Sequence, residues 1–471
     1  MPATTLLVHV HNRKRIQFNL SGIYPMLPLG IAVLGAELER AGLPVDLLDL
    51  SLPAYRGLDV AAKVGAGGYD LVGLSATVFS LPETIRLAAD IRRAAPRASI
   101  AVGGPATIFE PEVLARYLPD ADVFVFGEGE RSVVALARGG TDPANLAAIP
   151  GIAYRENGSL RRNPDAGPLE MDELARPARH LLPRGVYTMH PPFARFPPIT
   201  LVETARGCPF RCAFCSLPKT WRARSVPRVL EELREVAERD GVREVHFIDP
   251  TFTADPDRAL DLARAIEPLN LRFTFKTRVD RVDPGLLAAM RRAGCYLISY
   301  GIESLSGADL EYLDKGGTAG LGVARLRDTK AAGIDALAYM LVGNPEDDAR
   351  AVVRSTRRLI GAGCDFALFS GLFPDPATPI TQRAIERGWV TTEQVHELYF
   401  RQVRLPGDRG LSGHPAARVK RWVVLSFLLF YFSPRTLWRI ARRPRNYREF
   451  GRIASAALHL VADLLWRSRT V

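Results

Sequence analysis

Short apolar runs alternate with amphipathic stretches through the first 150 residues of the chain. Each run is four to six residues long and nearly continuous, which is typical of strands buried on both faces of a parallel sheet. The predicted strands are Leu6–Val10, Val45–Leu50, Leu71–Ala76, Ser99–Val102 and Val123–Phe126, and the predicted helices are Leu29–Ala41, Pro82–Ala95, Pro111–Tyr117 and Glu130–Ala137. This alternation predicts an α/β fold for residues 1–150, with a doubly wound, Rossmann-like sheet.

A hairpin and a proline-rich connector, together residues 151–198, separate this region from a second alternation. The hairpin is predicted at Gly151–Arg155 and Leu160–Arg162, around the turn Asn157-Gly158. Six further strands are predicted at Thr200–Thr204, Glu244–Ile248, Arg272–Thr277, Tyr296–Tyr300, Leu337–Val342 and Phe366–Ser370. With the helices between them, they predict a partial (β/α)6 barrel of the TIM type over residues 199–380. In such barrels the catalytic groups lie at the carboxyl ends of the strands.

The last region, residues 381–471, departs from this pattern and is predicted to be helical and basic. It contains an eleven-residue apolar run, Trp422–Phe432, and a helical pattern near Ile453–Trp466. Two interpretations stay open for this region. One is a helical cap that packs on the barrel and closes its cavity. The other is a basic amphipathic element that lies on an anionic membrane surface.

The charge of the chain is concentrated in this last region. Residues 401–471 hold 15 Lys and Arg against 3 Asp and Glu, a balance of +12, whereas the whole chain carries +11, so the remainder sums to about −1. No nucleic-acid recognition fold accompanies the arginine-rich stretch, so no nucleic-acid partner is expected. The chain has no signal peptide and no apolar run of membrane-spanning length, and we therefore expect a cytoplasmic location.

Three cysteines carry the strongest chemical signal in the sequence. Cys208, Cys212 and Cys215 lie on one short stretch just past the first predicted barrel strand. Thiolates at this spacing bind three irons of a 4Fe–4S cluster and leave the fourth iron free to bind a substrate. A structural zinc site would need a fourth ligand, and a disulfide cannot use three cysteines evenly. The distant Cys295 and Cys364 are interpreted as small buried apolar residues.

The cysteine loop and the strand-end motifs that follow it resemble the radical S-adenosylmethionine (SAM) superfamily. The matching stretches are Arg206–Cys215, His246–Phe252, Gly301–Ser304 and Leu341–Pro345. The resemblance implies that the three cysteines hold the cluster. It also implies SAM contacts from Phe214, Asp249, Arg278, Glu303, Ser304 and Gly343. The glycine pair common in the second-strand motif is replaced here by Asp249-Pro250.

Residues 1–150 resemble the cobalamin-binding domain that precedes such barrels. The matching motifs are Pro28-Leu29-Gly30, Val102-Gly103-Gly104-Pro105 and Gly127-Glu128-Gly129-Glu130. The resemblance implies cobalamin contacts from Ser75, Thr77, Gly103, Gly104, Gly127 and Glu128. The Asp-x-His-x-x-Gly sequence that supplies a lower cobalt ligand in other proteins is missing from these residues, which fits the branch that binds cobalamin without a protein histidine.

Three functions follow from the resemblance. The first is a cobalamin-dependent radical SAM enzyme that methylates an unactivated carbon of a small substrate of lipophilic or natural-product type. It would draw electrons from an external donor of the flavodoxin or ferredoxin type. The second is an oxidative cyclase, because Cys215–Arg222 is similar to the anaerobic magnesium-protoporphyrin ester cyclases. The third is a binding protein or electron carrier, which would need a fourth cysteine and would have no need of Glu303.

Overall fold

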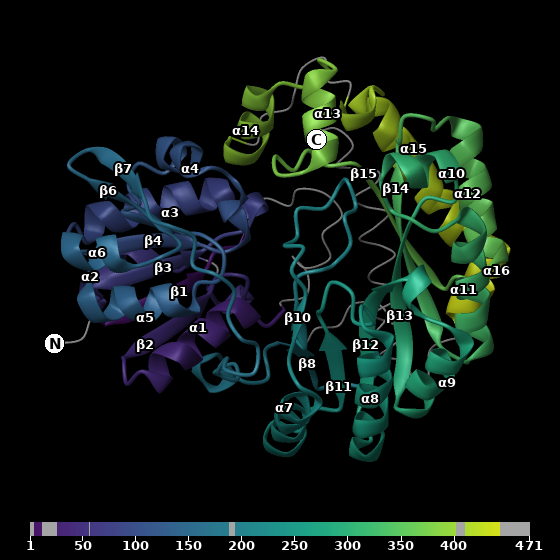
Figure 1. The fold of residues 1–471 in the computed structure, drawn as a ribbon, viewed down its shortest axis with the longest axis horizontal. Coiled ribbons are helices and arrows are strands. Elements are labelled where there is room, and N and C mark those ends of the chain that lie inside the picture. Colours follow the sequence, from purple (N-terminus) through teal and green to yellow (C-terminus); the bar gives the residue numbers. More distant parts are fainter. Residues whose placement is uncertain (1–3, 12–25, 56, 188–193, 402–409, 443–471) are drawn as a thin grey trace. The chain divides into compact units, whose positions relative to one another are not determined.

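The computed structural model describes residues 4–11, 26–55, 57–187, 194–401 and 410–442. These residues divide into two compact units (Figure 1). The first unit takes in the described residues up to Tyr187 together with residues 396–401. The second takes in residues 194–395 and those from Gly410 onward.

The first unit is built on a seven-stranded sheet in the order β2-β1-β3-β4-β5-β6-β7. The strands are β1 (Thr5–His9), β2 (Val45–Asp49), β3 (Leu71–Ser75), β4 (Ser99–Gly103), β5 (Val123–Val125), β6 (Ile152–Glu156) and β7 (Ser159–Arg162). The first five are parallel, which confirms the predicted doubly wound sheet. The predicted hairpin forms β6 and β7, which extend this sheet in antiparallel fashion beyond β5.

Six helices connect these strands in the described part of the first unit. They are α1 (Leu29–Arg40), α2 (Val60–Gly67), α3 (Leu81–Ala94), α4 (Pro111–Tyr117), α5 (Glu130–Gly139) and α6 (Pro143–Ala148). Two of them, α2 and α6, were not predicted because their sequences are short and rich in alanine. Their starts are nevertheless marked by capping aspartates: Asp59 accepts a bond from the Ala62 amide, and Asp142 accepts from the Ala144 amide.

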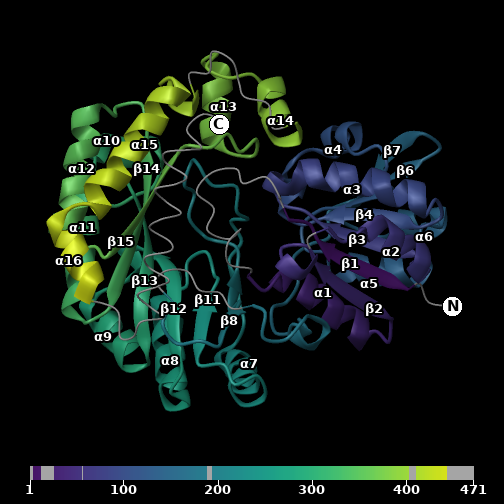
Figure 2. The same ribbon diagram turned by 180° about the vertical axis from the view of Figure 1, so that it is seen from behind.

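The second unit contains a six-stranded parallel sheet in the order β15-β14-β13-β12-β11-β8. The strands are β8 (Ile199–Val202), β11 (Glu244–Phe247), β12 (Arg272–Arg278), β13 (Cys295–Glu303), β14 (Asp335–Val342) and β15 (Phe366–Gly371). A small ribbon adds β9 (Ala205–Arg206) and β10 (Arg222–Ala223). The strands follow chain order from one edge to the other, as predicted for a partial barrel (Figure 2).

The helices of the second unit flank this sheet and then continue past its last strand. They are α7 (Val226–Arg239), α8 (Pro256–Ile266), α9 (Pro284–Arg292), α10 (Gly307–Tyr312), α11 (Ala319–Ala331), α12 (Ala349–Gly361), α13 (Pro379–Glu386), α15 (Ala416–Tyr431) and α16 (Pro434–Arg442). Helix α14 (Thr392–Phe400) is shared between the units, and its second half packs Phe400 on Phe109 and Tyr117 of the first unit.

The apolar run Trp422–Phe432 lies mostly within α15, which covers the free edge of the sheet at β15. Phe427 and Phe430 pack edge-on against Phe369 of that strand. The Tyr431 hydroxyl donates to the Ala367 carbonyl at 2.9 Å and accepts from the Ala367 amide at 3.2 Å, so it satisfies backbone groups that have no strand partner at this edge.

This packing supports the helical-cap interpretation of the run. None of the helices in the described ranges is long and apolar enough to span a bilayer. The helix predicted near Ile453–Trp466 lies outside the described residues.

Candidate functional site

The cysteine loop leaves the end of strand β8 and is closed at its base by the β9–β10 ribbon. Inside the loop the Cys208 amide donates to the Pro218 carbonyl at 2.9 Å. Gly207 has a positive φ of 74°, and a Cβ atom there would lie 2.0 Å from the Thr220 carbonyl oxygen. A glycine before the first cysteine is therefore required, because any side chain would force the base of the loop apart.

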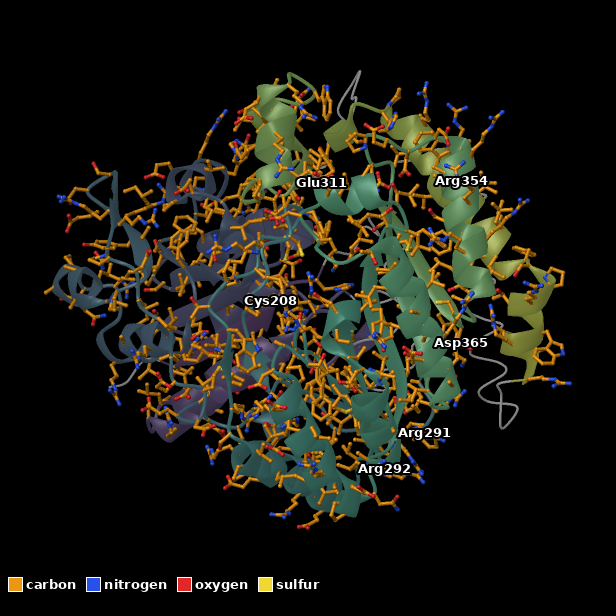
Figure 3. The ribbon with its side chains drawn as sticks, turned by 45° about the vertical axis from the view of Figure 1, so that its right-hand side comes forward. Cys208, Arg291, Arg292, Glu311, Arg354 and Asp365 are labelled. Atoms are coloured by element: carbon orange, nitrogen blue, oxygen red, sulfur yellow. The ribbon has the colours of Figure 1, made fainter. Side chains whose placement is uncertain are left out.

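The three thiols of this loop are unbridged, and the first two are buried (Figure 3 labels Cys208). Cys208 Sγ lies 3.4 Å from the Thr251 hydroxyl, and the Cys215 amide donates to the Cys212 carbonyl at 3.2 Å. Burial raises the pKa of the Cys212 thiol, while the cations of Lys315 and Arg278 act in the opposite direction. In the described part of the chain, no three Cys, His, Asp or Glu side chains are gathered closely enough to hold a single metal ion.

Arg278, at the end of β12, is fixed beside the second cysteine. Its Nη1 donates to Cys212 Sγ at 3.3 Å, and its other nitrogens bond Asp280 at 2.9 Å and the Lys315 carbonyl at 2.5 Å. Its guanidinium also stacks 4.1 Å from the Phe210 ring centroid. A cation held this firmly offsets the negative charge of thiolates and an iron cluster, so the donor set fits the cluster that the sequence predicts.

Glu303 and Lys315 form a buried ion pair next to Arg278. Lys315 Nζ lies 3.1 Å from Glu303 Oε1 and 5.8 Å from the Phe214 ring centroid. Burial raises the pKa of Glu303, and the neighbouring Lys315 lowers it. A Cβ at Gly301 would come within 2.6 Å of the carboxylate and 2.8 Å of the ammonium, so this glycine makes room for the pair.

Contacts thus link Cys212, Phe214, Arg278 and Glu303, and Cys208 acts electrostatically on Arg278. The structure adds Lys315 and Phe210, which were not predicted as site residues. Nothing local marks Lys315, which stands in a polar, glycine-containing turn that looks solvated in the sequence. Its role depends on a contact with Glu303, twelve residues earlier.

The other residues predicted to contact SAM are already engaged with the protein. Asp249 accepts from the Thr204 amide at 2.7 Å and from the Thr204 hydroxyl, and burial raises its pKa to about 6. Ser304 donates to Asp309 at 2.7 Å. Gly343 has a φ of 88°, and a Cβ there would lie 2.7 Å from Val419 of α15. The roles of these three residues toward SAM stay predictions.

In the first unit the residues predicted to contact cobalamin lie at the carboxyl ends of neighbouring strands. Ser75 and Gly103 are paired in register at the ends of β3 and β4. Gly104 has a φ of 91°, and a Cβ there would lie 2.9 Å from the Ala76 carbonyl oxygen. The Thr77 amide is bonded to Ser80 Oγ at 2.9 Å. Glycine and small polar groups at adjacent strand ends let a bulky ligand approach the backbone, so this edge fits a corrin ring.

The remaining two residues of this set differ from each other. Around Gly127 no atom lies within 4 Å of where a Cβ would stand, so the backbone is open there. Glu128, by contrast, accepts a bond from the Leu169 amide at 3.0 Å and thereby fixes the segment that follows the hairpin.

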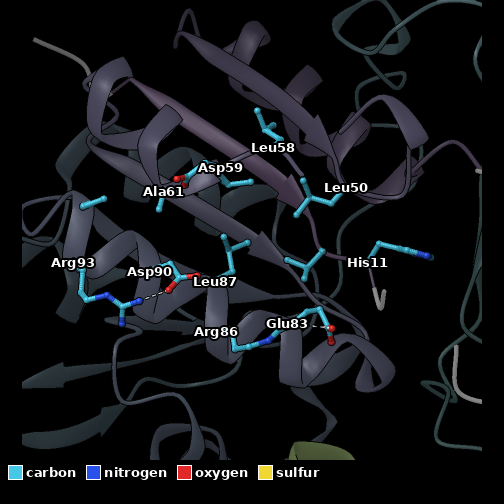
Figure 4. Close-up of a pocket in the computed structure, with 13 residues that line it drawn as sticks. His11, Leu50, Leu58, Asp59, Ala61, Glu83, Arg86, Leu87, Asp90 and Arg93 are labelled. Atoms are coloured by element: carbon cyan, nitrogen blue, oxygen red, sulfur yellow. Dashed lines mark hydrogen bonds and ion pairs between the residues drawn. The ribbon is translucent and has the colours of Figure 1, made fainter. Parts of the chain in front are cut away.

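A separate hollow of about 600 Å³ lies between the ends of β1 and β2 and helices α2 and α3 (Figure 4). His11, Leu50 and Leu87 line it, with the ion pair of Arg86 and Glu83 at 2.6 Å. The six residues predicted to contact cobalamin are not among its lining residues.

Comparisons with known proteins match a different domain family to each of the two units. Residues 202–359 match the profile of the radical SAM superfamily, and residues 22–137 match the B12 binding domain. An uncharacterized methyltransferase of Pyrococcus horikoshii is 29% identical over 417 residues, which cover 87% of this chain and 89% of that protein. The anaerobic magnesium-protoporphyrin IX monomethyl ester cyclase of Synechocystis is 24% identical over 428 residues, which cover 89% and 84%.

A solved structure extends the likeness of fold to the whole chain. The radical SAM methyltransferase TsrM of Kitasatospora setae, with cobalamin and a 4Fe–4S cluster bound, superimposes with a TM-score of 0.69 at 18% identity. The match covers 98% of this chain and all of TsrM. The chain thus combines a B12-binding domain with a radical SAM domain, the combination found in cobalamin-dependent radical SAM enzymes, and its cofactors are a 4Fe–4S cluster, SAM and cobalamin.

Proposed function

We propose that this enzyme transfers a methyl group to an unactivated carbon of a small substrate. The observation that carries the proposal is the presence in one chain of a three-cysteine loop at a barrel strand end and a B12-binding domain. When bound, the reduced cluster and SAM supply a radical that removes a hydrogen atom, and cobalamin supplies the methyl group.

The residues of the chain position these groups. The three cysteines, Cys208, Cys212 and Cys215, would ligate three irons. Arg278 donates to Cys212 Sγ and would thereby keep its positive charge beside the cluster. The Glu303 carboxylate, oriented by Lys315, is offered to the amino group of SAM, which carries the complementary charge. Asp249 would fix Thr204 at the start of the loop.

The test is an anaerobic reconstitution with iron, sulfide and cobalamin, followed by dithionite and SAM. We expect both 5′-deoxyadenosine and S-adenosylhomocysteine, measured by liquid chromatography and mass spectrometry. Formation of 5′-deoxyadenosine alone would support the cyclase type of chemistry instead. Neither product from a fully loaded protein would overturn both and favour a binding protein.

We also propose that electrons come from an external flavodoxin or ferredoxin, because the cysteines outside the loop, Cys295 and Cys364, are fully buried single thiols in separate strand units and offer no second cluster. A reduced flavodoxin should replace dithionite in the same assay. If it supports no 5′-deoxyadenosine formation while dithionite does, this donor class is wrong.

The end of the described chain supports a contact with an anionic membrane surface. Four large apolar side chains are exposed on α15, on α16 and in the turn between them, among them Phe432 at 59% and Trp438 at 57%. Residues 410–442 hold six Lys and Arg and no Asp or Glu. Exposed aromatic groups in a segment of net positive charge are the pattern of an interfacial helix on acidic lipid. Such a contact would bring a lipophilic substrate to the enzyme.

Sedimentation with vesicles tests this contact. Phosphatidylglycerol vesicles at low salt should retain the protein, and the variant Phe432→Ser/Trp438→Ala should lose about tenfold in binding, since two aromatic groups that would enter the lipid are removed. The control is Arg291→Gln/Arg292→Gln at the end of α9, which removes two positive charges elsewhere on the second unit and should bind normally (Figure 3). Equal loss in both variants, or no retention of the wild type, would overturn the contact.

A further inference from the structure

Lys276 is a charged residue on a central strand of the partial barrel. Strand β12 lies between β11 and β13, and its neighbouring residues Phe275 and Thr277 are 1% and 3% exposed. The Phe275 ring stacks on Phe252 at 4.7 Å, and the Thr277 hydroxyl bonds Thr253 at 2.5 Å. Because side chains alternate along a strand, Lys276 points to the opposite face.

That opposite face is the inside of the barrel. Arg278, two residues further along β12, lies on the same face and reaches Cys212. Lys276 is exposed to water although its two chain neighbours are buried. The Lys276 side chain can therefore be reached from solution on the same face of β12 that carries Arg278 toward the cysteine loop.

Two polar groups from the next strands accompany Lys276. Ser299 is its register partner on β13, and the phenol of Tyr339 on β14 hydrogen-bonds to Ser299. Tyr339 is in turn the register partner of Gly301, above which the pair of Glu303 and Lys315 is placed. An ammonium and two hydroxyls thus line three adjacent strands directly beneath that pair.

Lys276 has no direct partner for its charge in the described ranges: its ammonium makes no hydrogen bond or ion pair with any residue there. The carboxylate that acts electrostatically on the Lys276 ammonium is that of Asp249. Both oxygens of this carboxylate already accept hydrogen bonds from Thr204. Water reaches part of the Lys276 side chain, but the protein around its ammonium removes much of the solvation of the charge, and this lowers the pKa of Lys276. Removing an ammonium from water costs free energy unless a counter-ion lies beside it. In functional sites the counter-ion of such a group is commonly a ligand.

We infer that Lys276, with Ser299 and Tyr339, binds an oxyanion, a carboxylate or phosphate group, inside the barrel. Two sources can supply this chemistry: the carboxylate of SAM, or an acidic group on the substrate. The second source rests on the proposed function and deepens it, because it makes the methylated substrate an acid. The binding of an anion by Lys276 depends only on the barrel geometry.

Protection of Lys276 from acetylation tests the inference directly. Reconstituted holoenzyme is treated with sulfo-N-hydroxysuccinimide acetate, and modification of Lys276 is read by peptide mass spectrometry. Lys63, exposed on α2 of the first unit, is the reference for reagent activity. Four samples are compared. The first receives no ligand, the second SAM, the third decarboxylated SAM, and the fourth inorganic pyrophosphate together with decarboxylated SAM.

We expect Lys276 to be acetylated without ligand and protected about tenfold by an anion. Protection by SAM but not by decarboxylated SAM assigns the site to the SAM carboxylate. Protection by pyrophosphate but by neither form of SAM assigns it to an anionic substrate. A Lys276 that is never acetylated, or that is acetylated equally in every arm, would overturn the inference.

Variants give an independent readout. Lys276→Gln should weaken binding of the protecting anion about tenfold, and Lys276→Arg should restore most of it, with iron content unchanged in both. A loss of iron in Lys276→Gln alone would instead indicate a structural role for this lysine and overturn the inference. Failure of methyl transfer would leave the acetylation result readable, so the two proposals fail separately.

Discussion

The cysteine loop of the second unit and the strand-end loops of the first differ in what the chain itself supplies. Around the cysteines the chain provides reactive side chains: three thiols, the guanidinium of Arg278 and the pair of Glu303 and Lys315. At the ends of β3, β4 and β5 it provides mainly backbone, because Ser75, Gly103 and Gly127 carry little or nothing beyond Cα.

This difference follows from how each cofactor is held. A cluster needs covalent ligands and charge compensation, so its site depends on the identity of side chains. A corrin ring without a protein ligand needs space and backbone polar groups, so its site depends on the absence of side chains. Substitutions should therefore damage the two sites in opposite ways: by removing atoms from the second unit and by adding atoms to the first.

The largest effect is expected from removing a thiol. Cys212→Ser should abolish the cluster and lower 5′-deoxyadenosine formation by more than about 10³-fold, since radical formation depends on the cluster. Iron and sulfide analysis and electron paramagnetic resonance measure the loss. The control is Cys295→Ala, which removes a fully buried thiol from β13 and should keep its iron. Equal turnover in Cys212→Ser and the wild type would contradict the cluster assignment.

The next effect is expected from Arg278. Arg278→Gln should keep iron bound but lower SAM cleavage by about 10²-fold, because it removes the only cation bonded to Cys212 in the described residues. Removing this positive charge should also make the cluster harder to reduce, which a redox titration measures.

The matched control is Arg281→Gln. Arg281 stacks on the same Phe210 ring, at 4.8 Å, but makes no bond to a cysteine in the described structure. Equal losses in the two variants would show that the ring contact, and not the bond to sulfur, matters.

The pH dependence of stability tests the role of Asp249, which supports the start of the cysteine loop by accepting bonds from Thr204. Its folded pKa of about 6 lies above the unfolded value of 3.8, so the native state binds the extra proton between these values. Stability should therefore fall by about 3 kcal/mol as pH rises from about 4 to 6, and this contribution should stay constant above. Urea unfolding of cluster-free protein measures it. Asp249→Asn should lose that part of the slope, and an unchanged slope would show that Asp249 ionises normally.

The architecture was predictable from sequence because buried parallel strands leave continuous apolar runs, such as Leu71–Ala76, that match β3 within a residue. The cysteine loop was predictable because its spacing is local. Lys315 and Val419 could not be predicted in the same way. Lys315 meets Glu303 through a chain reversal, and Val419 presses on Gly343 from a helix more than seventy residues later. Contacts of this kind exist only once the barrel and its cap are folded.

A partial signal was nevertheless present for Lys276. A lysine in the middle of Phe-Thr-Phe-Lys-Thr-Arg, between aromatic and other buried positions, contradicts the pattern of a strand buried on both faces. This charged residue in the interior of a predicted barrel strand is a sequence signal for the anion site that we propose around Lys276.

The smallest effect should come from adding a methyl group to the first unit. A Cβ at Gly103 would lie 3.5 Å from Val125 Cβ, an ordinary contact, so Gly103→Ala should fold with unchanged stability. The new methyl would nevertheless occupy the strand-end surface, and we expect about tenfold weaker cobalamin binding, measured by cobalt retention and absorption. Gly104→Ala is the contrasting variant, because its Cβ would meet backbone at 2.9 Å and should destabilise the fold itself. Full cobalamin affinity in a stable Gly103→Ala protein would mean that the corrin ring does not approach this strand end. The site in the first unit would then not depend on the absence of side chains.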